Sequence, residues 1–236
     1  MPKMKFADEK PVIMSIGGSL IVPGEKPDAT FLAKVKDLVE RQAEKGKKII
    51  IVTGGGKICR NYQDAAREAS SEITDIDLDW IGIETTKLNG FLLKKVLGDL
   101  AHEDLITTPI SEPVNWEKGA LIVSGWEPGG SSDRVVCLLA ELHSAKQIIN
   151  LSNIDHVYSE DPRKNPEAES FDNLSWADYR KMVGNEWSPG LSAPFDPIAS
   201  KICNEGNIDV AIVNGADMAN VENLINGEEF TGTVLS

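Results

Sequence analysis

The chain has 236 residues, 41% of them hydrophobic, and its 24 Lys and Arg against 37 Asp and Glu give a formal net charge of -13. This length and composition suffice for one large domain with a buried core, while the acidic balance argues against nucleic acid or an anionic membrane as a partner. No apolar run approaches the roughly 20 residues that span a bilayer, and the polar segment from Met1 to Lys10 lacks the apolar stretch of a signal peptide.

Apolar runs typical of buried strands alternate with segments of helical periodicity. Strands are predicted at residues 11–16, 48–53, 121–124, 147–151 and 209–213. Helices are predicted at residues 28–45, 80–100, 133–142, 176–183, 198–205 and 218–225. A further helix is predicted to begin soon after Gly56, with Tyr62, Ala65 and Ala66 facing the core. The most polar stretch, residues 159–172, is predicted to be a surface loop. The alternation predicts an α/β fold in which helices sandwich a mostly parallel central sheet, in one domain over residues 1–236.

Two of the predicted strands end in glycine clusters, at Gly17-Gly18-Ser19 and at Gly54-Gly55-Gly56-Lys57. Glycines let backbone amides approach a ligand, and a helix that starts there adds unpaired N–H groups and partial positive charge, which suits phosphate. Neither cluster is a Walker A loop, because the chain has no Gly-x-x-x-x-Gly-Lys-Ser/Thr. The second cluster half-matches a dinucleotide-binding fingerprint, but Cys59 stands in place of the third glycine.

A third polar turn follows the strand predicted at 121–124. It begins at Gly125-Trp126 and ends at Ser131-Ser132-Asp133, just before a predicted helix. Taken alone, the serines and the aspartate are ordinary helix N-caps. In a parallel sheet, however, all three turns lie at the same edge, where such folds bind ligands.

In their order and spacing these segments resemble the amino acid kinase superfamily, and within it the compact archaeal type of uridylate (UMP) kinase. The resemblance covers nearly the whole chain. Besides the three turns, it is carried by Asp79-Trp80-Ile81-Gly82-Ile83, Asn153-Ile154-Asp155, Asp161-Pro162, Phe195-Asp196-Pro197, Lys201, Val213-Asn214-Gly215 and Gly232-Thr233. It implies a carbamate-kinase-like fold and transfer of the γ-phosphoryl group of ATP to UMP, giving UDP for pyrimidine nucleotide biosynthesis.

The resemblance also implies roles for individual residues. Lys201, Asp133 and Ser19 would be catalytic, and ATP would lie against Gly17, Gly18, Ser19, Asn153, Tyr158, Asp161 and Pro162. UMP would lie against Gly54, Gly55, Arg60, Asp79, Gly125, Trp126, Ser131 and Ser132. Residues 1–145 would form the acceptor lobe and 146–236 the ATP lobe, with Mg²⁺ carried mainly by the ATP phosphates. From sequence position alone, Asp79 fits a helix cap equally well, and Lys201 fits a solvated helix position better.

These roles agree with the chemistry of phosphoryl transfer, in which the protein positions two anions in line and stabilises spread-out negative charge. Helix N-termini, Lys57, Arg60 and Lys201 would supply the positive environment. An arginine at position 60 suits a bidentate grip on phosphate. No nucleophile from the protein is needed, because an oxygen of the UMP phosphate attacks directly.

Four positions depart from the family pattern. Ser15 stands where many members carry a lysine, which shifts charge neutralisation to Lys201 and the metal. Trp126 replaces a usual small Thr and would narrow the acceptor pocket or stack on a base. His156 replaces a usual Gly, which would strain the backbone if that position needs positive φ. Arg134 replaces a small residue, and either a phosphate contact or a solvent-facing position is open to it.

Other functions stay open at this point. Trp126, Arg134 and His156 leave room for a nucleotide-binding storage or regulatory protein on the same fold, of the molybdenum-storage kind. Another small-molecule kinase of the superfamily is a further alternative, although Ile58, Cys59 and Arg60 fill the stretch where isopentenyl phosphate kinases carry a catalytic His. A dinucleotide oxidoreductase is the weakest alternative.

The expected partners are small-molecule nucleotides and further copies of the chain. The resemblance implies a homo-oligomer, typically a hexamer assembled from dimers. The three cysteines, Cys59, Cys137 and Cys203, lie far apart in sequence and include no CxxC pair. They therefore suit reduced thiols in a cytoplasm better than a disulfide framework or a zinc site.

Overall fold

A computed structural model describes residues 1–236 except 118, 163, 187–190 and 192. Its main feature is a seven-stranded sheet in the order β3-β2-β1-β4-β8-β9-β7. The strands are β1 (Val12–Ile16), β2 (Lys48–Thr53), β3 (Gly119–Val123), β4 (Gln147–Ser152), β8 (Asp209–Asn214), β9 (Thr233–Leu235) and β7 (Asn173–Leu174). From β3 to β8 every neighbouring pair is parallel, and β9 runs antiparallel to β8. The predicted mostly parallel sheet is confirmed.

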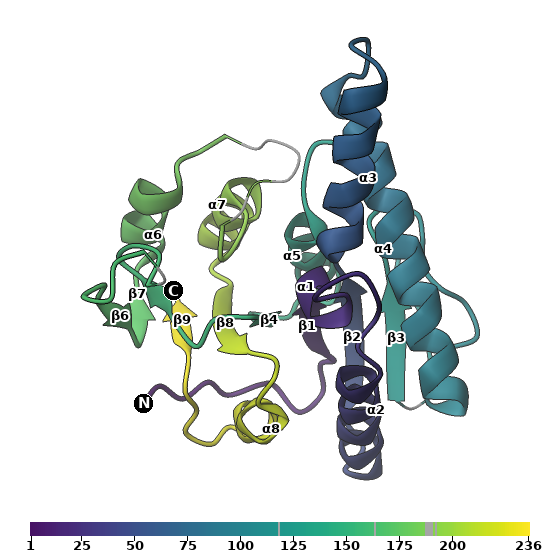
Figure 1. Cartoon of the computed structure of the whole chain (residues 1–236). Coiled ribbons are helices and arrows are strands. Elements are labelled where there is room, and N and C mark those ends of the chain that lie inside the picture. The colour runs from purple at the N-terminus through teal and green to yellow at the C-terminus, as the bar shows by residue number, and fades with distance from the viewer. Residues whose placement is uncertain (118, 163, 187–190, 192) are drawn as a thin grey trace.

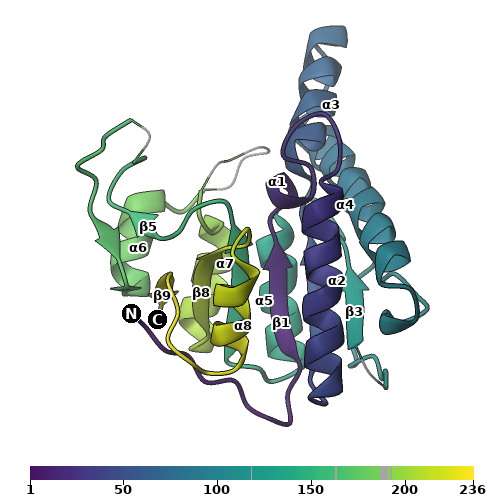
Figure 2. The same ribbon diagram turned by 60° about the horizontal axis from the view of Figure 1, so that its bottom comes forward.

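Helices cover both faces of the sheet (Figure 2). They are α1 (Gly18–Ile21), α2 (Ala29–Glu44), α3 (Gly56–Ala69), α4 (Asp75–Leu97), α5 (Ser132–Leu142), α6 (Trp176–Val183), α7 (Pro197–Gly206) and α8 (Met218–Ile225). The helices α2 and α8 pack on one face and α5 and α7 on the other, while α3 and α4 run side by side at the β3 end of the molecule (Figures 1 and 2).

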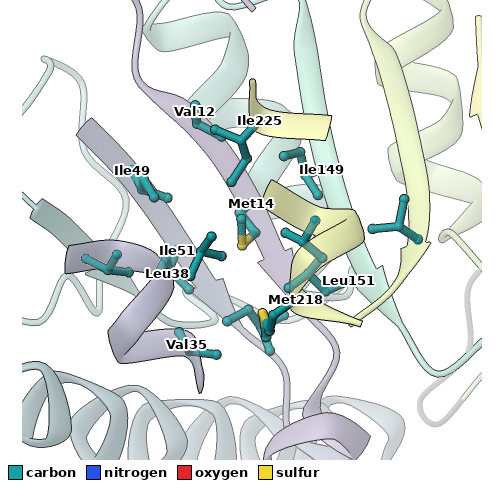
Figure 3. Close-up of a cluster of buried hydrophobic side chains, with 14 of the residues drawn as sticks. Val12, Met14, Val35, Leu38, Ile49, Ile51, Ile149, Leu151, Met218 and Ile225 are labelled. Carbon is teal, nitrogen blue, oxygen red and sulfur yellow. The ribbon is translucent and has the colours of Figure 1, made fainter. Parts of the chain in front are cut away.

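Alternate residues of each central strand enter two separate apolar cores. Met14, Ile51 and Leu151 point toward α2 and α8 (Figure 3), while Ile13 and Ile50 point toward α5 and α7. Strands buried on both faces explain why their sequences are almost wholly apolar. Burial of this surface, at about 25 cal/mol per Å² of apolar area, is the main stabilising contribution to the fold.

The sheet divides at the boundary between β1 and β4. Strands β1, β2 and β3 come from the first part of the chain, and β4, β8, β9 and β7 come from the later part. The strand order therefore reverses beside β1, and in parallel sheets ligands bind outside the carboxyl ends of the strands at such a point. The glycine turns after β1 and β2 lie at this edge.

Three sequence predictions need correction. Tyr62 and Ala65, both predicted to face the core, are exposed, Tyr62 with 61% of its surface, and Gln63 is the buried residue of α3. The helix predicted from residue 80 begins at Asp75, because Thr74 forms a capping box with Asp77. The loop predicted at 159–172 contains β6 (Ser170–Phe171), which pairs antiparallel with β5 (Val157–Tyr158).

Candidate active site

The two glycine turns are in direct backbone contact. A Cβ placed on Gly18 would lie 2.0 Å from the backbone nitrogen of Gly56, and one placed on Gly54 would lie 2.6 Å from the nitrogen of Gly18. Gly56 also has a φ of 75°, a conformation that glycine adopts without strain. The sequence predicted two separate turns at one edge of the sheet. In the structure, they form a single surface.

The helices that start at these turns lack side-chain caps. Gly17 precedes α1 and Gly55 precedes α3, and neither has a side chain that accepts a hydrogen bond from the helix. Each of the other six α-helices in the described part of the chain has such a cap, for example Asp28 on α2 and Asp217 on α8. The 14-residue α3 therefore presents uncapped N–H groups, which suit an anion.

A cavity of about 240 Å³ opens beside this contact and is named here the glycine-turn cavity. All eight residues predicted to bind UMP line it: Gly54, Gly55, Arg60, Asp79, Gly125, Trp126, Ser131 and Ser132. Gly18, Glu127 and Arg134 line it as well. The structure thus brings together residues that lie as far as 173 positions apart in sequence, from Gly18 to Leu191.

Hydrogen bonds fix the wall formed by residues 125–131. The Oδ2 atom of Asp79 accepts from the backbone N–H of Gly129 at 2.8 Å, and Oγ1 of Thr86 accepts from Gly125 at 2.8 Å. Asp79 lies one turn inside α4, so the alternative that it caps a helix is wrong. Both contacts tie the loop after β3 to α4.

Sequence reasoning missed the polar residues of α4 that support the second glycine turn. The Nδ2 atom of Asn89 donates to the carbonyl oxygens of Gly54 at 2.8 Å and Gly55 at 3.1 Å. Asn89 is buried, as are Thr85 and Thr86. The sequence feature that could have identified them is the spacing of three polar residues at positions i, i+1 and i+4, on the inward face of a helix where apolar residues are the rule.

Two carboxylates lie behind the third turn. Asp196 is 3% exposed and accepts from the backbone N–H of Ser131 at 2.9 Å and from its hydroxyl at 2.6 Å. Asp133 accepts from the Ser15 hydroxyl at 3.3 Å and from the backbone N–H of Asp196 at 3.1 Å. Burial and the neighbouring Asp196 charge raise the pKa of Asp133 to about 7. Ser131 also caps α5, so the predicted capping and the position in the cavity wall coexist.

A second cavity, of about 320 Å³, lies beside β4 and β5 and is named here the β5 cavity. Four of the residues predicted to bind ATP line it: Asn153, Tyr158, Asp161 and Pro162. Asn153 also lines a groove that contains Ser19, and Gly17 donates its backbone N–H to Leu151 at 2.9 Å. The first glycine turn therefore lies between the two cavities.

Lys201 is placed differently from the other predicted site residues. It lies on α7 with 58% of its side chain exposed, and its Nζ is 3.9 Å from Oε1 of Glu205. Among the described residues that line the two cavities and the Ser19 groove, Lys201 is not present. Lys57, on the first turn of α3, is also exposed.

The departures from the family pattern occupy specific places. Trp126 is 6% exposed, and its indole Nε1 has no hydrogen-bond partner in the described part of the chain. Arg134 forms an ion pair with Glu127, with Nη1 to Oε1 at 3.1 Å. His156 Nε2 lies 3.4 Å from Asp172 Oδ1. Positive φ outside glycine is confined, within the described residues, to Ser144 and Asn207, so His156 is not strained in that way.

Within the described residues, no group of three or more His, Cys, Asp and Glu side chains is arranged to hold a metal ion. None of the helices described has the length and apolarity needed to cross a bilayer.

Comparison with known proteins agrees with this geometry. The model of the amino acid kinase family matches residues 10–214. A uridylate kinase from Methanococcoides burtonii is 34% identical over 217 residues, covering 89% of this chain and 88% of the relative, and one from Pyrococcus abyssi is 32% identical over 231 residues, covering 94% and 98%. The crystal structure of uridylate kinase from Archaeoglobus fulgidus matches with a TM-score of 0.77 at 28% identity, covering 96% of this chain and 100% of that chain. The chain belongs to the amino acid kinase family.

Proposed function

We propose that this protein transfers the γ-phosphoryl group of ATP to UMP. The glycine-turn cavity would bind UMP, and the β5 cavity would bind the nucleoside of ATP. The observation that carries the proposal is the pair of uncapped glycine turns in contact with each other between these cavities. The curated relatives above, which carry the name uridylate kinase, support the choice of UMP.

In this proposal the acceptor is held by backbone amides and one arginine. The phosphate of UMP would accept from N–H groups at Gly55 and the first turn of α3, with Arg60 beside it. Asp79 would accept from a ribose hydroxyl, and Ser131 and Ser132 would face the base or the phosphate. Residues 1–145 would act as the acceptor lobe and 146–236 as the ATP lobe.

The transfer itself needs little covalent chemistry from the protein. An oxygen of the UMP phosphate attacks the γ-phosphorus of ATP, and the bond to the β–γ bridging oxygen breaks, so that ADP leaves with the electron pair. Fixed N–H groups at Gly18 and Ser19 would stabilise the charge that spreads over the transferred group, while the N–H of Gly17, which donates to the Leu151 carbonyl, anchors the turn. Because these donors are held by the backbone contact with Gly56, they need no rearrangement during the reaction.

Two elements of the positive environment come from outside the cavities. Mg²⁺ would enter bound to the phosphate oxygens of ATP, as part of the substrate. Lys201, whose side chain is 58% exposed, would need to turn from its position near Glu205 toward the phosphates. Asp133 would hold Ser15 and the start of α7 in place behind the transferred group.

We also propose that the chain forms a homo-oligomer, with a hexamer expected from the family resemblance and a cytoplasmic location. The outer face of α3 and α4 carries five exposed large apolar side chains: Tyr62, Ile76, Trp80, Leu88 and Phe91. Three of them, Tyr62, Trp80 and Leu88, line a hollow of about 410 Å³. Since α4 begins with Asp75 and Asp77 and ends with Lys94 and Lys95, an antiparallel α4 from a second copy would match both charge and apolar surface.

The test of the catalytic proposal is a coupled assay of ADP release with Mg-ATP and saturating nucleotide. UMP should be converted to UDP, and CMP and AMP should react much more slowly. If ATP binds tightly without any UMP-dependent turnover, the proposal is wrong and a storage or regulatory role on the same fold is favoured. Calorimetry with a non-hydrolysable ATP analogue distinguishes these outcomes.

A further inference from the structure

The glycine-turn cavity has two cationic side chains in its described lining, and they come from different helices. Arg60 comes from α3, beside the second glycine turn, and Arg134 comes from α5, beside the third turn. Two acidic side chains, Asp79 and Glu127, also line the cavity. Asp79 is engaged by the backbone N–H of Gly129, and Glu127 is engaged by Arg134.

Arg134 occupies a position where a cation alone is unfavourable. It is the third residue of α5, and the N-terminal turn of a helix carries partial positive charge that repels a guanidinium. An anion beside it removes this penalty. Without a ligand, Glu127 provides that anion at 3.1 Å.

Packing places the Arg134 side chain over the third turn. A Cβ added to Gly130 would lie 2.6 Å from Cδ of Arg134 and 3.1 Å from its Cβ. The stem of the arginine therefore lies directly against the backbone of Gly130, and only 27% of the side chain is exposed. Because Gly130 has no side chain, the stem of Arg134 can pack against its backbone, and this packing positions the guanidinium at the cavity.

The ion pair with Glu127 is exchangeable. Glu127 has 50% of its side chain exposed, and an exposed ion pair of this kind contributes little to stability. A phosphate group offers an arginine two parallel charge-assisted hydrogen bonds and carries more charge than one carboxylate. A phosphate that enters the cavity should therefore displace Glu127.

We propose that Arg134 is a second phosphate-binding residue of the acceptor site, with Glu127 as the anion that holds it in place until the nucleotide arrives. This inference rests on the proposed function, because it takes the phosphate of UMP as the ligand. Arg60 from α3 and Arg134 from α5 would then both bind that phosphate. The second cation would offset the absence of a lysine at position 15, where the Ser15 hydroxyl donates to Asp133.

The test is calorimetry of UMP and of uridine binding without ATP. Arg134→Ala should weaken UMP binding about 10- to 100-fold and leave uridine binding unchanged, because uridine lacks the phosphate. Arg134→Lys keeps the positive charge but loses the two-pronged hydrogen-bonding geometry of the guanidinium. Its UMP affinity should therefore fall between those of the wild type and Arg134→Ala. Glu127→Gln should leave UMP affinity equal to or higher than that of the wild type. Arg67→Ala, which removes an exposed arginine paired with Asp64 on α3, is the matched control and should change neither affinity.

Unchanged UMP affinity in Arg134→Ala would overturn the proposal, and so would equal losses for UMP and uridine. Equal losses in Arg134→Ala and Glu127→Gln would overturn it as well, since the pair would then be purely structural. Thermal melts verify that each variant is folded. If Arg134→Ala does not fold, Arg134→Lys and Glu127→Gln still decide the test. UMP that binds to the wild type without turnover refutes the catalytic proposal alone, whereas absence of UMP binding refutes both.

Discussion

Gly18 and Gly56 are packed so closely that neither position has room for a Cβ atom. A Cβ on Gly18 would lie 2.0 Å from the backbone nitrogen of Gly56, and one on Gly56 would lie 2.4 Å from the carbonyl oxygen of Gly18. The obstructing atoms are all backbone, so no side-chain rotation relieves the clash. This contact joins the turns at the carboxyl ends of β1 and β2 into one surface.

The first prediction is that Gly18→Ala separates the two turns. The methyl group must push the backbone of Gly54–Gly56 away, which displaces the N–H groups proposed to bind both phosphates. We expect kcat/KM for UMP to fall at least about 100-fold, since misplacement by about 1 Å has effects of this size. Gly24→Ala is the control, because nothing lies within 4 Å of a Cβ at Gly24. Equal activity of the two variants would contradict the role given to the contact.

The second prediction concerns Asn89, which supports the second turn from α4. Asn89→Ala leaves the carbonyl oxygens of Gly54 and Gly55 without their donor and should lower the free energy of unfolding by about 1–3 kcal/mol. Lys87→Ala, which removes an exposed ion pair with Glu84 on the same helix, should cost about 0–1 kcal/mol. Urea unfolding of both variants measures the difference, and a larger loss in Lys87→Ala would count against the assignment.

The central strands were predictable from sequence to within about two residues, because strands buried on both faces are short apolar runs. The strand at Lys48–Thr53 matches its predicted bounds. The two- and three-residue strands β5, β6, β7 and β9 were not predictable. Segments this short carry no periodicity, and they pair only because tertiary contacts bring them together.

The resemblance predicted residues that line the glycine-turn cavity, but it did not predict the α4 residues that hydrogen-bond to them from behind. Asn89 and Thr86 lie on the inward face of a helix, and sequence periodicity identifies that face without saying what it touches. Tyr62 shows the opposite error. An aromatic residue was assumed to face the core, but α3 lies at the end of the molecule and exposes Tyr62 beside Trp80 in a shared hollow.

The third prediction is a pH dependence of stability that is due to Asp133. Its pKa is raised from 3.8 to about 7 in the folded protein, so the folded state holds this proton more tightly than the unfolded state does. Asp133 therefore lowers the free energy of unfolding as pH rises from about 4 to about 7, and the loss is complete above that range. Asp133→Asn removes this titration. The difference in unfolding free energy between variant and wild type should shift in favour of the variant across that window, and a constant difference from pH 4 to pH 8 would contradict the shift.

The fourth prediction tests the apolar face of α3 and α4. Trp80 is 44% exposed and lies with Tyr62 and Leu88 around the same hollow, so a second copy packed there would bury it. Trp80→Glu places a charge in that contact and should weaken self-association about 100-fold or more, as loss of a buried aromatic anchor does. Ala33→Glu adds the same charge at an exposed position of α2 and should leave assembly unchanged.

Sedimentation velocity at several protein concentrations measures both variants. A wild-type chain that sediments as a monomer at all of them would refute the proposed oligomer, and an unchanged assembly in Trp80→Glu would place the interface elsewhere. Because Arg60 and Asp79 lie on these same two helices, UMP turnover by a dissociated variant also shows whether the acceptor cavity needs the second copy for its shape.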